Sequence, residues 1–311
     1  MITTLTLNPA VDRTLNIEKV ALGQLNRVDQ VKTTPGGKGI NVARVLKKIN
    51  IDVKAMGILG GEMGEYIKHV LDSEKIKTKF TWSNYSTRQN LKIREISGRE
   101  TEINESGKAT KKEFNDLLNN LEDNLNNSDL LVMGGSLPEG FPIDSYKQII
   151  DMAHKYNVKT LLDTSGKNLT EGLKGKPFLI KPNLYEVENF IDKKITNDKD
   201  LIKAGNYFIN QGVKNVVISL GSKGAVLINE QKNIKAVPPK IKVKNTTVGA
   251  GDTMVAGICY GIEKKLSLED LITFATSLAS YYVKVGNFSE INFDKVINMK
   301  EKVKVKTIKE E

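Results

Sequence analysis

Residues 245 to 257 read Asn-Thr-Thr-Val-Gly-Ala-Gly-Asp-Thr-Met-Val-Ala-Gly, and this stretch is the strongest indication of how the chain folds and works. Gly249, Ala250 and Gly251 are small enough to let the backbone turn tightly and approach a ligand closely. The residues after them form an apolar, helix-forming segment. The pattern predicts a loop at a helix N-terminus, where backbone N–H groups and the helix dipole favour an anion.

Asp252 stands in the first turn of that predicted helix and admits two interpretations. A carboxylate repels a bound anion, so its presence makes sense if it removes a proton from a hydroxyl that attacks a phosphoryl group held by the loop. The alternative is a helix cap beside an ordinary glycine turn, since acidic caps are common. This segment by itself favours neither interpretation.

A second glycine-rich stretch, Pro-Gly-Gly-Lys-Gly-Ile-Asn-Val-Ala, covers residues 35 to 43. Apolar residues then recur at helical spacing as far as Ile49, which predicts an amphipathic helix. Its start is another candidate anion site, with Lys38 on it and the amide of Asn41 one turn in. The plainer alternative is an exposed lysine in a glycine-rich turn, but three glycines at a helix start favour a ligand.

From residue 112 onward the predicted helices alternate with short apolar strands. We predict helices near 112–125, 144–156, 184–191 and 198–211, and strands near 130–133, 159–163, 178–180 and 216–218. This alternation is typical of an α/β fold whose mostly parallel sheet is covered by helices on both faces. We expect a hairpin within 224–237 and a frayed lysine- and glutamate-rich tail from Lys300.

Polar clusters follow several of these strands, at residues 134–138, 163–165, 181–183 and 219–221. Ligands of such sheets bind beyond the carboxyl ends of the strands, so these clusters indicate one shared site. Asn183 and Glu186, three residues apart at a helix start, could hold a hydrated Mg²⁺ through water. For this pair alone we favour the alternative, an ordinary helix cap with a first-turn acid.

Four polar segments suggest a smaller second sheet. Residues 14–20 and 26–33 read as short polar strands, and 87–94 with 100–104 read as a polar hairpin. They contain too few apolar residues for core strands. We therefore predict one domain over residues 1–311 with a discontinuous β lid from about 11–34 and 86–106. Arg88 and Lys92 would share one face of their strand.

The composition of the chain argues against several classes of function. The 311 residues are 39% hydrophobic and 27% charged, as in an ordinary soluble globular protein. The net charge of +10 comes from scattered lysines that do not alternate with aromatic residues, which argues against nucleic-acid binding. No apolar run could span a membrane. The one cysteine, Cys259, cannot form an internal disulfide, so we expect a reducing cytoplasm, a core position for Cys259, and surface positions for His69 and His154.

The motifs together resemble those of a known family. Residues 35–43 and 247–252 resemble the two signatures of the ribokinase-like, phosphofructokinase B family of sugar kinases. Residues 181–186 resemble its Asn-x-x-Glu magnesium motif, and residues 219–224 its nucleotide-binding turn. No Walker loop is present, because no Gly-Lys pair is followed by Ser or Thr. The resemblance runs from Leu5 to about Asn287, and four separated motifs in order make it specific.

The resemblance implies a role for each matching residue. Asp252 would be the catalytic base, and Gly249, Ala250 and Gly251 the anion hole. The implied sugar-phosphate ligands are Asp12, Gly37, Lys38, Asn41, Arg88, Asn90 and Ser136. The implied ATP ligands are Lys181, Asn183, Ser219, Gly221, Gly224 and Thr247, with Asn183 and Glu186 holding Mg²⁺ through water. Lys38 and Arg88 would lie near the phosphate that the substrate already carries, because fixed cations bind a phosphate best.

The chain is similar to the bacterial 1-phosphofructokinases and tagatose-6-phosphate kinases within that family. The resemblance implies that D-fructose 1-phosphate is phosphorylated by ATP at its 6-hydroxyl. Tagatose 6-phosphate is the second choice and fructose 6-phosphate the third. Asn104 is followed by Glu-Ser-Gly-Lys at residues 105–108, whereas a Gly-Pro pair commonly follows this Asn in the family. This departure bears on sugar selectivity. The polar strands match the family's lid, which implies a homodimer through it.

Two other classes of function are weighed against the kinase. A non-enzymatic sugar-phosphate sensor would need Lys38 and Arg88 but not Asp252. A nucleic-acid binder would rely on the net charge of +10 and lose affinity steeply with salt. The four matching motifs favour the kinase over both.

Overall fold

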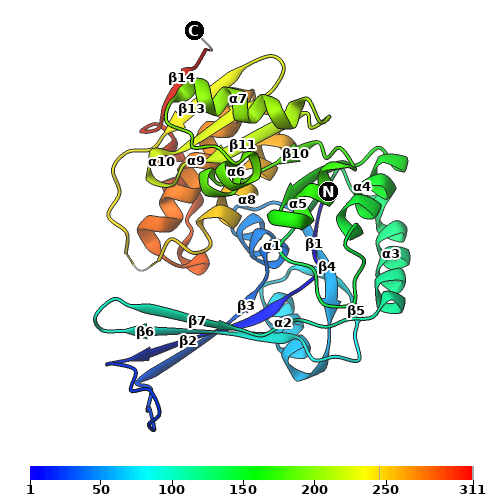
Figure 1. Ribbon diagram of the computed structural model, residues 1–311, viewed down its shortest axis with the longest axis vertical. Helices are drawn as coiled ribbons and strands as arrows, with labels where there is room; N and C mark the ends of the chain where they lie inside the picture. The colour runs from blue at the N-terminus through cyan, green and yellow to red at the C-terminus, as the bar shows by residue number, and fades with distance from the viewer. Residues whose placement is uncertain (245, 310–311) are drawn as a thin grey trace.

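The computed structural model describes residues 1 to 244 and 246 to 309. Asn245, the first residue of the glycine-rich stretch at 245–257, lies outside the described residues. The described chain forms a ten-stranded sheet in the body of the molecule and a four-stranded sheet that extends from it (Figure 1).

The ten-stranded sheet has the strand order β14-β13-β12-β11-β10-β9-β8-β1-β4-β5. Its strands are β1 (Ile2–Thr6), β4 (Val53–Leu59), β5 (Lys77–Trp82), β8 (Leu130–Gly134), β9 (Lys159–Asp163), β10 (Leu179–Ile180), β11 (Asn215–Ser219), β12 (Ala225–Ile228), β13 (Asn233–Val237) and β14 (Lys304–Thr307). Neighbours from β11 to β5 pair in parallel, and the three remaining strands add antiparallel pairs at one edge. The ends of β1, β8 and β9 lie in register, with Gly134 between Thr6 and Asp163.

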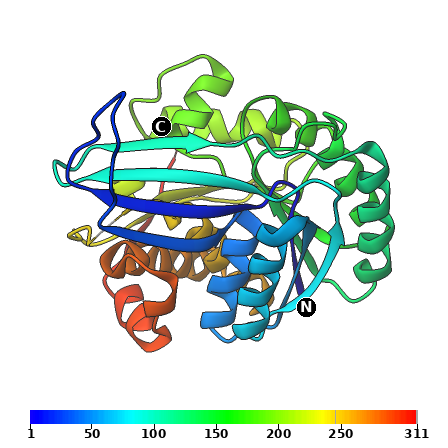
Figure 2. The same cartoon turned by 90° about the horizontal axis from the view of Figure 1, so that it is seen from below.

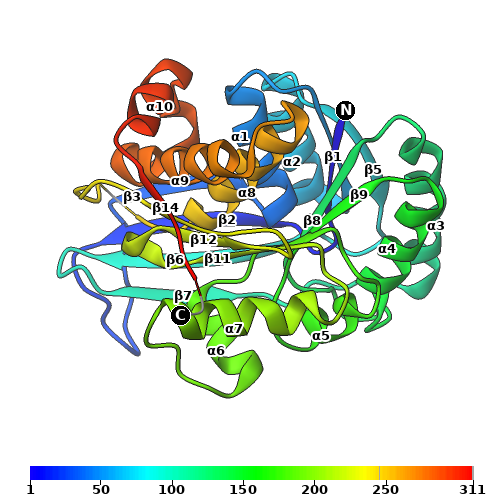
Figure 3. The same ribbon diagram turned by 90° about the horizontal axis from the view of Figure 1, so that it is seen from above.

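Helices cover both faces of this sheet, as Figures 1 and 3 show. One face carries α1 (Lys38–Lys48), α2 (Gly61–Ser73), α8 (Ala250–Glu263), α9 (Leu268–Val285) and α10 (Phe293–Lys300). The other carries α3 (Lys111–Leu125), α4 (Ser145–Lys155), α5 (Gly166–Leu173), α6 (Leu184–Ile191) and α7 (Asp198–Ile209). The predicted α/β fold is confirmed.

Strand β8 explains why the sheet needs both layers. Leu130 and Val132 belong to the hydrophobic core on one face, whereas Leu131 and Met133 belong to the core on the other. Successive side chains of a strand point to opposite faces, so an apolar run supplies both cores. Burial of each such side chain stabilises the fold by about 1.5–3 kcal/mol, and neither face can be left open to water.

The small sheet consists of β2 (Ala10–Ile17), β3 (Gln30–Gly36), β6 (Arg88–Glu95) and β7 (Glu100–Asn104), in the order β3-β2-β6-β7. Its central strands β2 and β6 pair in parallel, and the outer pairs are antiparallel. Figure 2 shows it lying across the molecule beside α1 and α2. The four predicted strands are present, but the first begins at Ala10, where it pairs with Gly36 and Arg88.

Two further predictions can be compared with the structure. The hairpin expected within 224–237 is confirmed as β12 and β13. The tail expected to fray from Lys300 instead forms β14, which pairs with β13. Lys306 of β14 and Lys235 of β13 both bind the Asp198 carboxylate, so backbone pairing with β13 and these ion pairs together hold this exposed strand. Residues 310 and 311 lie outside the described residues.

The remaining expectations concern single residues and membranes. Cys259 is buried in the core, and His69 and His154 are exposed, as predicted. Among the helices of residues 1–244 and 246–309, none combines the length and apolar character that a membrane span requires.

Candidate active site

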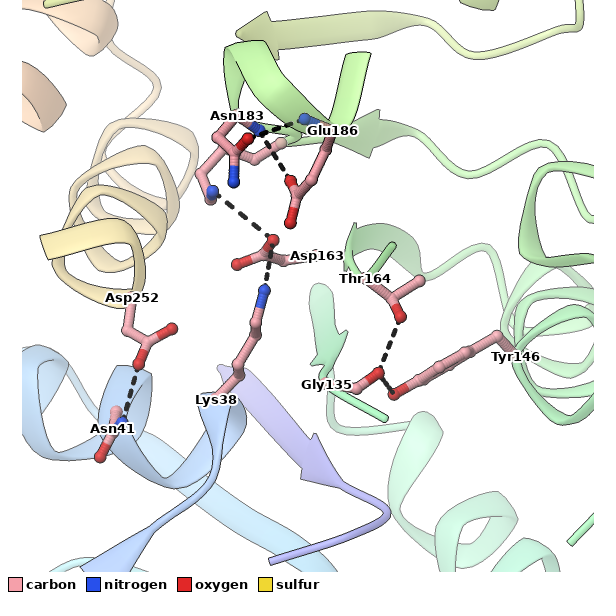
Figure 4. Close-up of polar contacts among 10 residues, drawn as sticks. Lys38, Asn41, Gly135, Tyr146, Asp163, Thr164, Asn183, Glu186 and Asp252 are labelled. Atoms are coloured by element: carbon pink, nitrogen blue, oxygen red, sulfur yellow. Dashed lines mark hydrogen bonds and ion pairs between the residues drawn. The ribbon is translucent and has the colours of Figure 1, made fainter. Parts of the chain in front are cut away.

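Asp252 lies at the centre of the candidate site, in the first turn of α8. The N-cap of this helix is Gly249, with φ of 92°, and no side chain caps it. The Asp252 carboxylate instead accepts a hydrogen bond from Asn41 of α1, with 2.7 Å between Asn41 Nδ2 and Asp252 Oδ2 (Figure 4). The two glycine-rich stretches, far apart in sequence, therefore meet at this carboxylate, and Asp252 is not the helix cap.

Burial, and next the nearby carboxylate of Asp163, raise the pKa of Asp252 to about 6. Lys38, the hydrogen bond from Asn41, and Lys181 act in the opposite direction. A carboxyl group with a pKa near the working pH is well suited to accept a proton from a sugar hydroxyl.

Asp163 forms the second part of the site, at the end of β9. Its Oδ1 lies 2.9 Å from Lys38 Nζ and 3.5 Å from Lys181 Nζ. The side chains of Asp163 and Lys181 are each only 4% exposed. Burial would raise the pKa of Asp163, but Lys181 and Lys38 outweigh that effect and hold the pKa below its usual value. This carboxylate therefore stays ionised between two ammonium groups.

The role of Asp163 is not evident from the sequence. The sequence shows only an acidic residue in a polar cluster after an apolar strand. Its partner Lys38 lies 125 residues away, so only the fold brings the pair together. The position at a strand end was the available signal, because ligands bind at that edge.

The turn after β8 lies next to Asp163 and is held from two sides. The Gly135 carbonyl accepts hydrogen bonds from the Tyr146 hydroxyl at 3.0 Å and the Thr164 hydroxyl at 2.7 Å (Figure 4). The predicted sugar ligand Ser136 accepts a hydrogen bond from Asn8 Nδ2 at 2.9 Å. Asn8 is thus a further residue of the site that the sequence did not single out for a role.

Asp12, Asn90 and Arg88 form a hydrogen-bonded chain across the small sheet. Asn90 Nδ2 donates to Asp12 Oδ1 at 2.8 Å, and Arg88 Nη1 donates to Asn90 Oδ1 at 3.1 Å. Burial raises the pKa of Asp12, although Asn90 and then Arg88 lower it in part. A Cβ on Gly36 would overlap Asp12 Oδ2 at 2.3 Å, so the glycine lets Asp12 reach the start of α1.

The two cations expected near one phosphate have different partners. Lys38 is bound to Asp163, on the Asp252 side of the site. Arg88 contacts Asn90 and the backbone carbonyls of Glu105 and Asn8, and its buried Nε has no hydrogen-bond partner. A guanidinium with an unused buried donor fits an anionic ligand.

The predicted nucleotide ligands lie at the ends of β10 and β11. Asn183 and Ser219 form a parallel bridge, and the Ser219 amide donates to the Pro182 carbonyl at 3.0 Å. Gly221 and Gly224 turn the chain after β11, and a Cβ on Gly224 would lie 1.9 Å from the Ala236 carbonyl oxygen. The close approach of β13 therefore requires glycine at 224.

Lys181 links this nucleotide side to the start of α8. A Cβ built on Gly251 would lie 3.7 Å from Lys181 Nζ, so the ammonium group is next to the loop. Thr247 is exposed, and its carbonyl accepts a hydrogen bond from the Ala250 amide at 3.1 Å. The Ala250 amide is therefore engaged in the turn, whereas Gly251 and Asp252 stand where a helix offers its N–H groups no internal partner.

Asn183 and Glu186 form a reciprocal capping box at the start of α6. The Glu186 amide donates to Asn183 Oδ1, and the Asn183 amide donates to Glu186 Oε2, each at 2.8 Å. The cap that we favoured for this pair is present (Figure 4). Within the described residues, no cluster of three or more His, Cys, Asp and Glu side chains could hold a metal ion.

A family model described as pfkB family carbohydrate kinase matches residues 5 to 292. The chain belongs to this family. This pfkB kinase is 41% identical over 292 residues to a 1-phosphofructokinase of Borreliella burgdorferi, covering 93% of this chain and 94% of that protein. It is 38% identical over 312 residues to a tagatose-6-phosphate kinase of Staphylococcus epidermidis, covering 98% and 100%.

The pfkB kinase is also similar to solved structures. The tetrameric inhibited form of phosphofructokinase-2 from Escherichia coli aligns with a TM-score of 0.87 and 30% identity, over 96% of this chain and 98% of that one. The family resemblance drawn from four motifs is confirmed, and so is the fold that it implied. As a carbohydrate kinase the protein transfers a phosphoryl group to a sugar hydroxyl.

Proposed function

We propose that this kinase phosphorylates D-fructose 1-phosphate at its 6-hydroxyl with ATP, giving fructose 1,6-bisphosphate and ADP. The observation that carries the proposal is the buried Asp252 carboxylate, held by Asn41 in the first turn of α8. A proton acceptor at a helix N-terminus serves both requirements of the reaction, an activated hydroxyl and stabilised phosphoryl charge.

In the proposed step, Asp252 takes the proton of the sugar 6-hydroxyl as its oxygen bonds to the γ-phosphorus of ATP. The bond from that phosphorus to the bridging oxygen breaks, and its electron pair leaves with ADP. Backbone amides at the start of α8 and the ammonium group of Lys181 stabilise the charge on the transferred group. Lys38 stays paired with Asp163 beside the carboxylate.

When bound, Mg²⁺ would neutralise part of the charge on the ATP phosphates. We propose that Asn183 and Glu186 hold its water ligands, because Mg²⁺ keeps several waters and needs few protein oxygens. Their capping box engages one oxygen of each side chain, Asn183 Oδ1 and Glu186 Oε2. The other carboxylate oxygen of Glu186 can therefore accept a hydrogen bond from a metal-bound water.

Sugar preference is proposed from the polar chain Asp12–Asn90–Arg88 and from the relatives. Arg88 would bind the phosphate already present, and Asp12 with Asn41 would bind sugar hydroxyls. Relatives of both substrate classes cover most of this chain, and the higher identity is to a 1-phosphofructokinase. Tagatose 6-phosphate is the alternative substrate, followed by fructose 6-phosphate.

We further propose that the small sheet acts as a lid over the sugar and that two chains associate through it. Its connections and outer strand expose Leu22, Leu25, Ile96 and Ile103, which are 55% to 89% exposed. Apolar side chains grouped on a protruding sheet favour a partner surface. The inhibited form of the E. coli phosphofructokinase-2 is described as tetrameric. For this chain we propose a dimer. We also propose that the protein works in a reducing cytoplasm.

Kinetics with fructose 1-phosphate, tagatose 6-phosphate and fructose 6-phosphate test the proposal. We expect kcat/KM to be highest for fructose 1-phosphate. Asp252→Asn should reduce kcat by about 10² to 10⁴-fold while ATP binding persists. Turnover by Asp252→Asn at the wild-type rate would rule out Asp252 as the base. Equal efficiency on unphosphorylated fructose would rule out the proposed phosphate site.

A further inference from the structure

Tyr282, near the end of α9, contacts the loop that begins α8. Its hydroxyl donates a hydrogen bond to the Val248 carbonyl at 2.6 Å. The side chain is buried in the core beneath the loop, and Val248 directly precedes the N-cap Gly249. None of the sequence motifs includes Tyr282, and the contact joins residues 34 apart.

The hydrogen bond fixes a whole peptide unit. The peptide between Val248 and Gly249 is planar and trans, so its C=O and N–H point in opposite directions. Since the Val248 carbonyl points into the core toward Tyr282, the Gly249 amide must point away from the core. An amide that points away from the core can donate to an anion bound at the loop. The Ala250 amide is engaged with Thr247, which leaves more of the anion-binding role to its neighbours.

Packing holds the tyrosine ring in place. It stacks on Phe288 of the short helix η2 (Phe288–Glu290), with 4.9 Å between ring centroids and 29° between ring planes. A Cβ on Gly249 would lie 2.7 Å from the Tyr282 hydroxyl and 3.0 Å from the Phe288 ring. The loop therefore rests directly on the aromatic pair, and Gly249 is required both by this contact and by its φ of 92°.

The tyrosine keeps its proton under working conditions. Burial, and then the charge of Asp252, raise the pKa of Tyr282 to about 12. The hydroxyl is thus a donor at any pH at which a kinase would operate.

We propose that Tyr282 is a positioning residue for phosphoryl transfer, which aims the Gly249 amide at the transferred group through the Val248 carbonyl. It would not touch substrate itself. The inference rests on the proposed function in one respect, since it assumes that the loop holds the transferred phosphoryl group. An amide that meets charge only in the transition state should affect kcat more than substrate affinity.

Tyr282→Phe tests the inference, because it keeps the ring stack and removes only the hydroxyl. Tyr281→Phe is the matched control: Tyr281 is the adjacent, equally buried residue of α9, and no hydrogen bond joins it to the loop within the described residues. We expect Tyr282→Phe to lower kcat about tenfold. KM for ATP and the ketose phosphate should change less than about twofold. Binding of ADP with aluminium fluoride, in calorimetry, should weaken about as much as kcat falls.

Three results would overturn the inference: an unchanged kcat, an equal fall in Tyr281→Phe, or a parallel loss of substrate affinity and melting temperature. The wild-type enzyme separates this test from that of the proposed function. Its own turnover on the three ketose phosphates decides the substrate, whereas the ratio of Tyr282→Phe to wild type on the preferred substrate decides the role of Tyr282.

Discussion

Asp163 and Asp252 are two buried carboxylates of one site, and their pKa values are shifted in opposite directions. Asp163 has two ammonium groups within 3.5 Å, which keep it ionised in spite of burial. Asp252 has one amide donor and the charge of Asp163 nearby, so burial dominates. When the environments of two neighbouring acids shift their pKa values apart, the two acids have different roles. Here Asp163 is a fixed anion and Asp252 is a proton acceptor.

The first prediction concerns the pH dependence of the reaction. Because Asp252 must be ionised to accept a proton, kcat/KM should rise about tenfold per pH unit below about 6 and level off above it. Asn41→Ala removes a hydrogen bond to the ionised form, so the break in the profile should move to higher pH. A flat profile between pH 5 and 7, or an unmoved break in Asn41→Ala, would contradict the assignment.

The second prediction concerns the stability supplied by Asp163. Its folded pKa lies below the unfolded value of 3.8, so the ion pairs contribute fully above that value and are lost as pH falls through the folded pKa. At pH 7, Asp163→Asn should lower the free energy of unfolding by about 3 kcal/mol, since it strands the buried Lys181 charge. Urea unfolding measures this loss.

Adding Lys181→Met to Asp163→Asn provides the control. The double variant removes the stranded charge together with its partner, so it should be more stable than Asp163→Asn alone. Equal or lower stability of the double variant would mean that packing, and not charge, accounts for the loss.

At the scale of elements, α6 combines a structural and a proposed chemical role in one pair of residues. The box between Asn183 and Glu186 satisfies two backbone amides of the helix start. The Glu186 carboxylate points toward Asp163 in Figure 4, and we propose that it also holds metal-bound water there. A cap and a metal-water ligand differ in what they need, because capping accepts either Glu or Gln whereas metal binding favours the charge.

The third prediction uses this difference. Glu186→Gln should keep the melting temperature within about 2 °C, since Gln completes the box, yet raise the Mg²⁺ concentration needed for half-maximal rate about tenfold. Glu186→Ala should lose both the cap and the Mg²⁺ ligand, and its free energy of unfolding should fall by about 1 kcal/mol. A normal Mg²⁺ requirement in Glu186→Gln would leave the pair with the capping role alone.

Elements with a clear local pattern, such as an amphipathic helix or a short apolar strand, could be predicted, whereas several elements without such a pattern could not. Helix α9 is buried from Leu271 to Tyr282 on every side, so its sequence lacks the polar face that marks an amphipathic helix. Strand β5 has the opposite problem: Lys77 and Lys79 make it read as polar, since it is the edge strand of its sheet. The strand at 304–307 needs β13 beside it and is not evident from its own residues.

The same limit applies to the site. The stretches at 35–43 and 247–252 predicted that Asn41 and Asp252 belong to a ligand site, but not that they touch, because 211 residues separate them. Lys38 was expected at the sugar phosphate and is found paired with Asp163. Local sequence predicts which residue types a site needs, whereas the pairing of charges depends on long-range contacts.

At the scale of the whole molecule, the small sheet stands out because its outer strand β7 is exposed along its whole length. Figures 1 and 2 show it extending from the body, with its strand connections at the far end. Leu22 and Leu25 in the β2–β3 connection and Ile96 in the β6–β7 turn are 78% to 89% exposed. Water competes as phosphoryl acceptor at an open site, so closure of the lid over the sugar would favour transfer to the sugar. A second chain that covers these exposed side chains would help to hold the lid in place.

The last prediction tests this association. Light scattering should give the wild-type protein twice the chain mass of 34.5 kDa, and Leu25→Glu should shift it to the single-chain mass, since a buried unpaired carboxylate opposes association. Ile143→Glu, at an exposed apolar residue outside the small sheet, is the control and should stay dimeric. If the lid works only when paired, Leu25→Glu should also raise KM for the ketose phosphate. A wild-type monomer, or a Leu25→Glu dimer, would show that the small sheet does not mediate assembly.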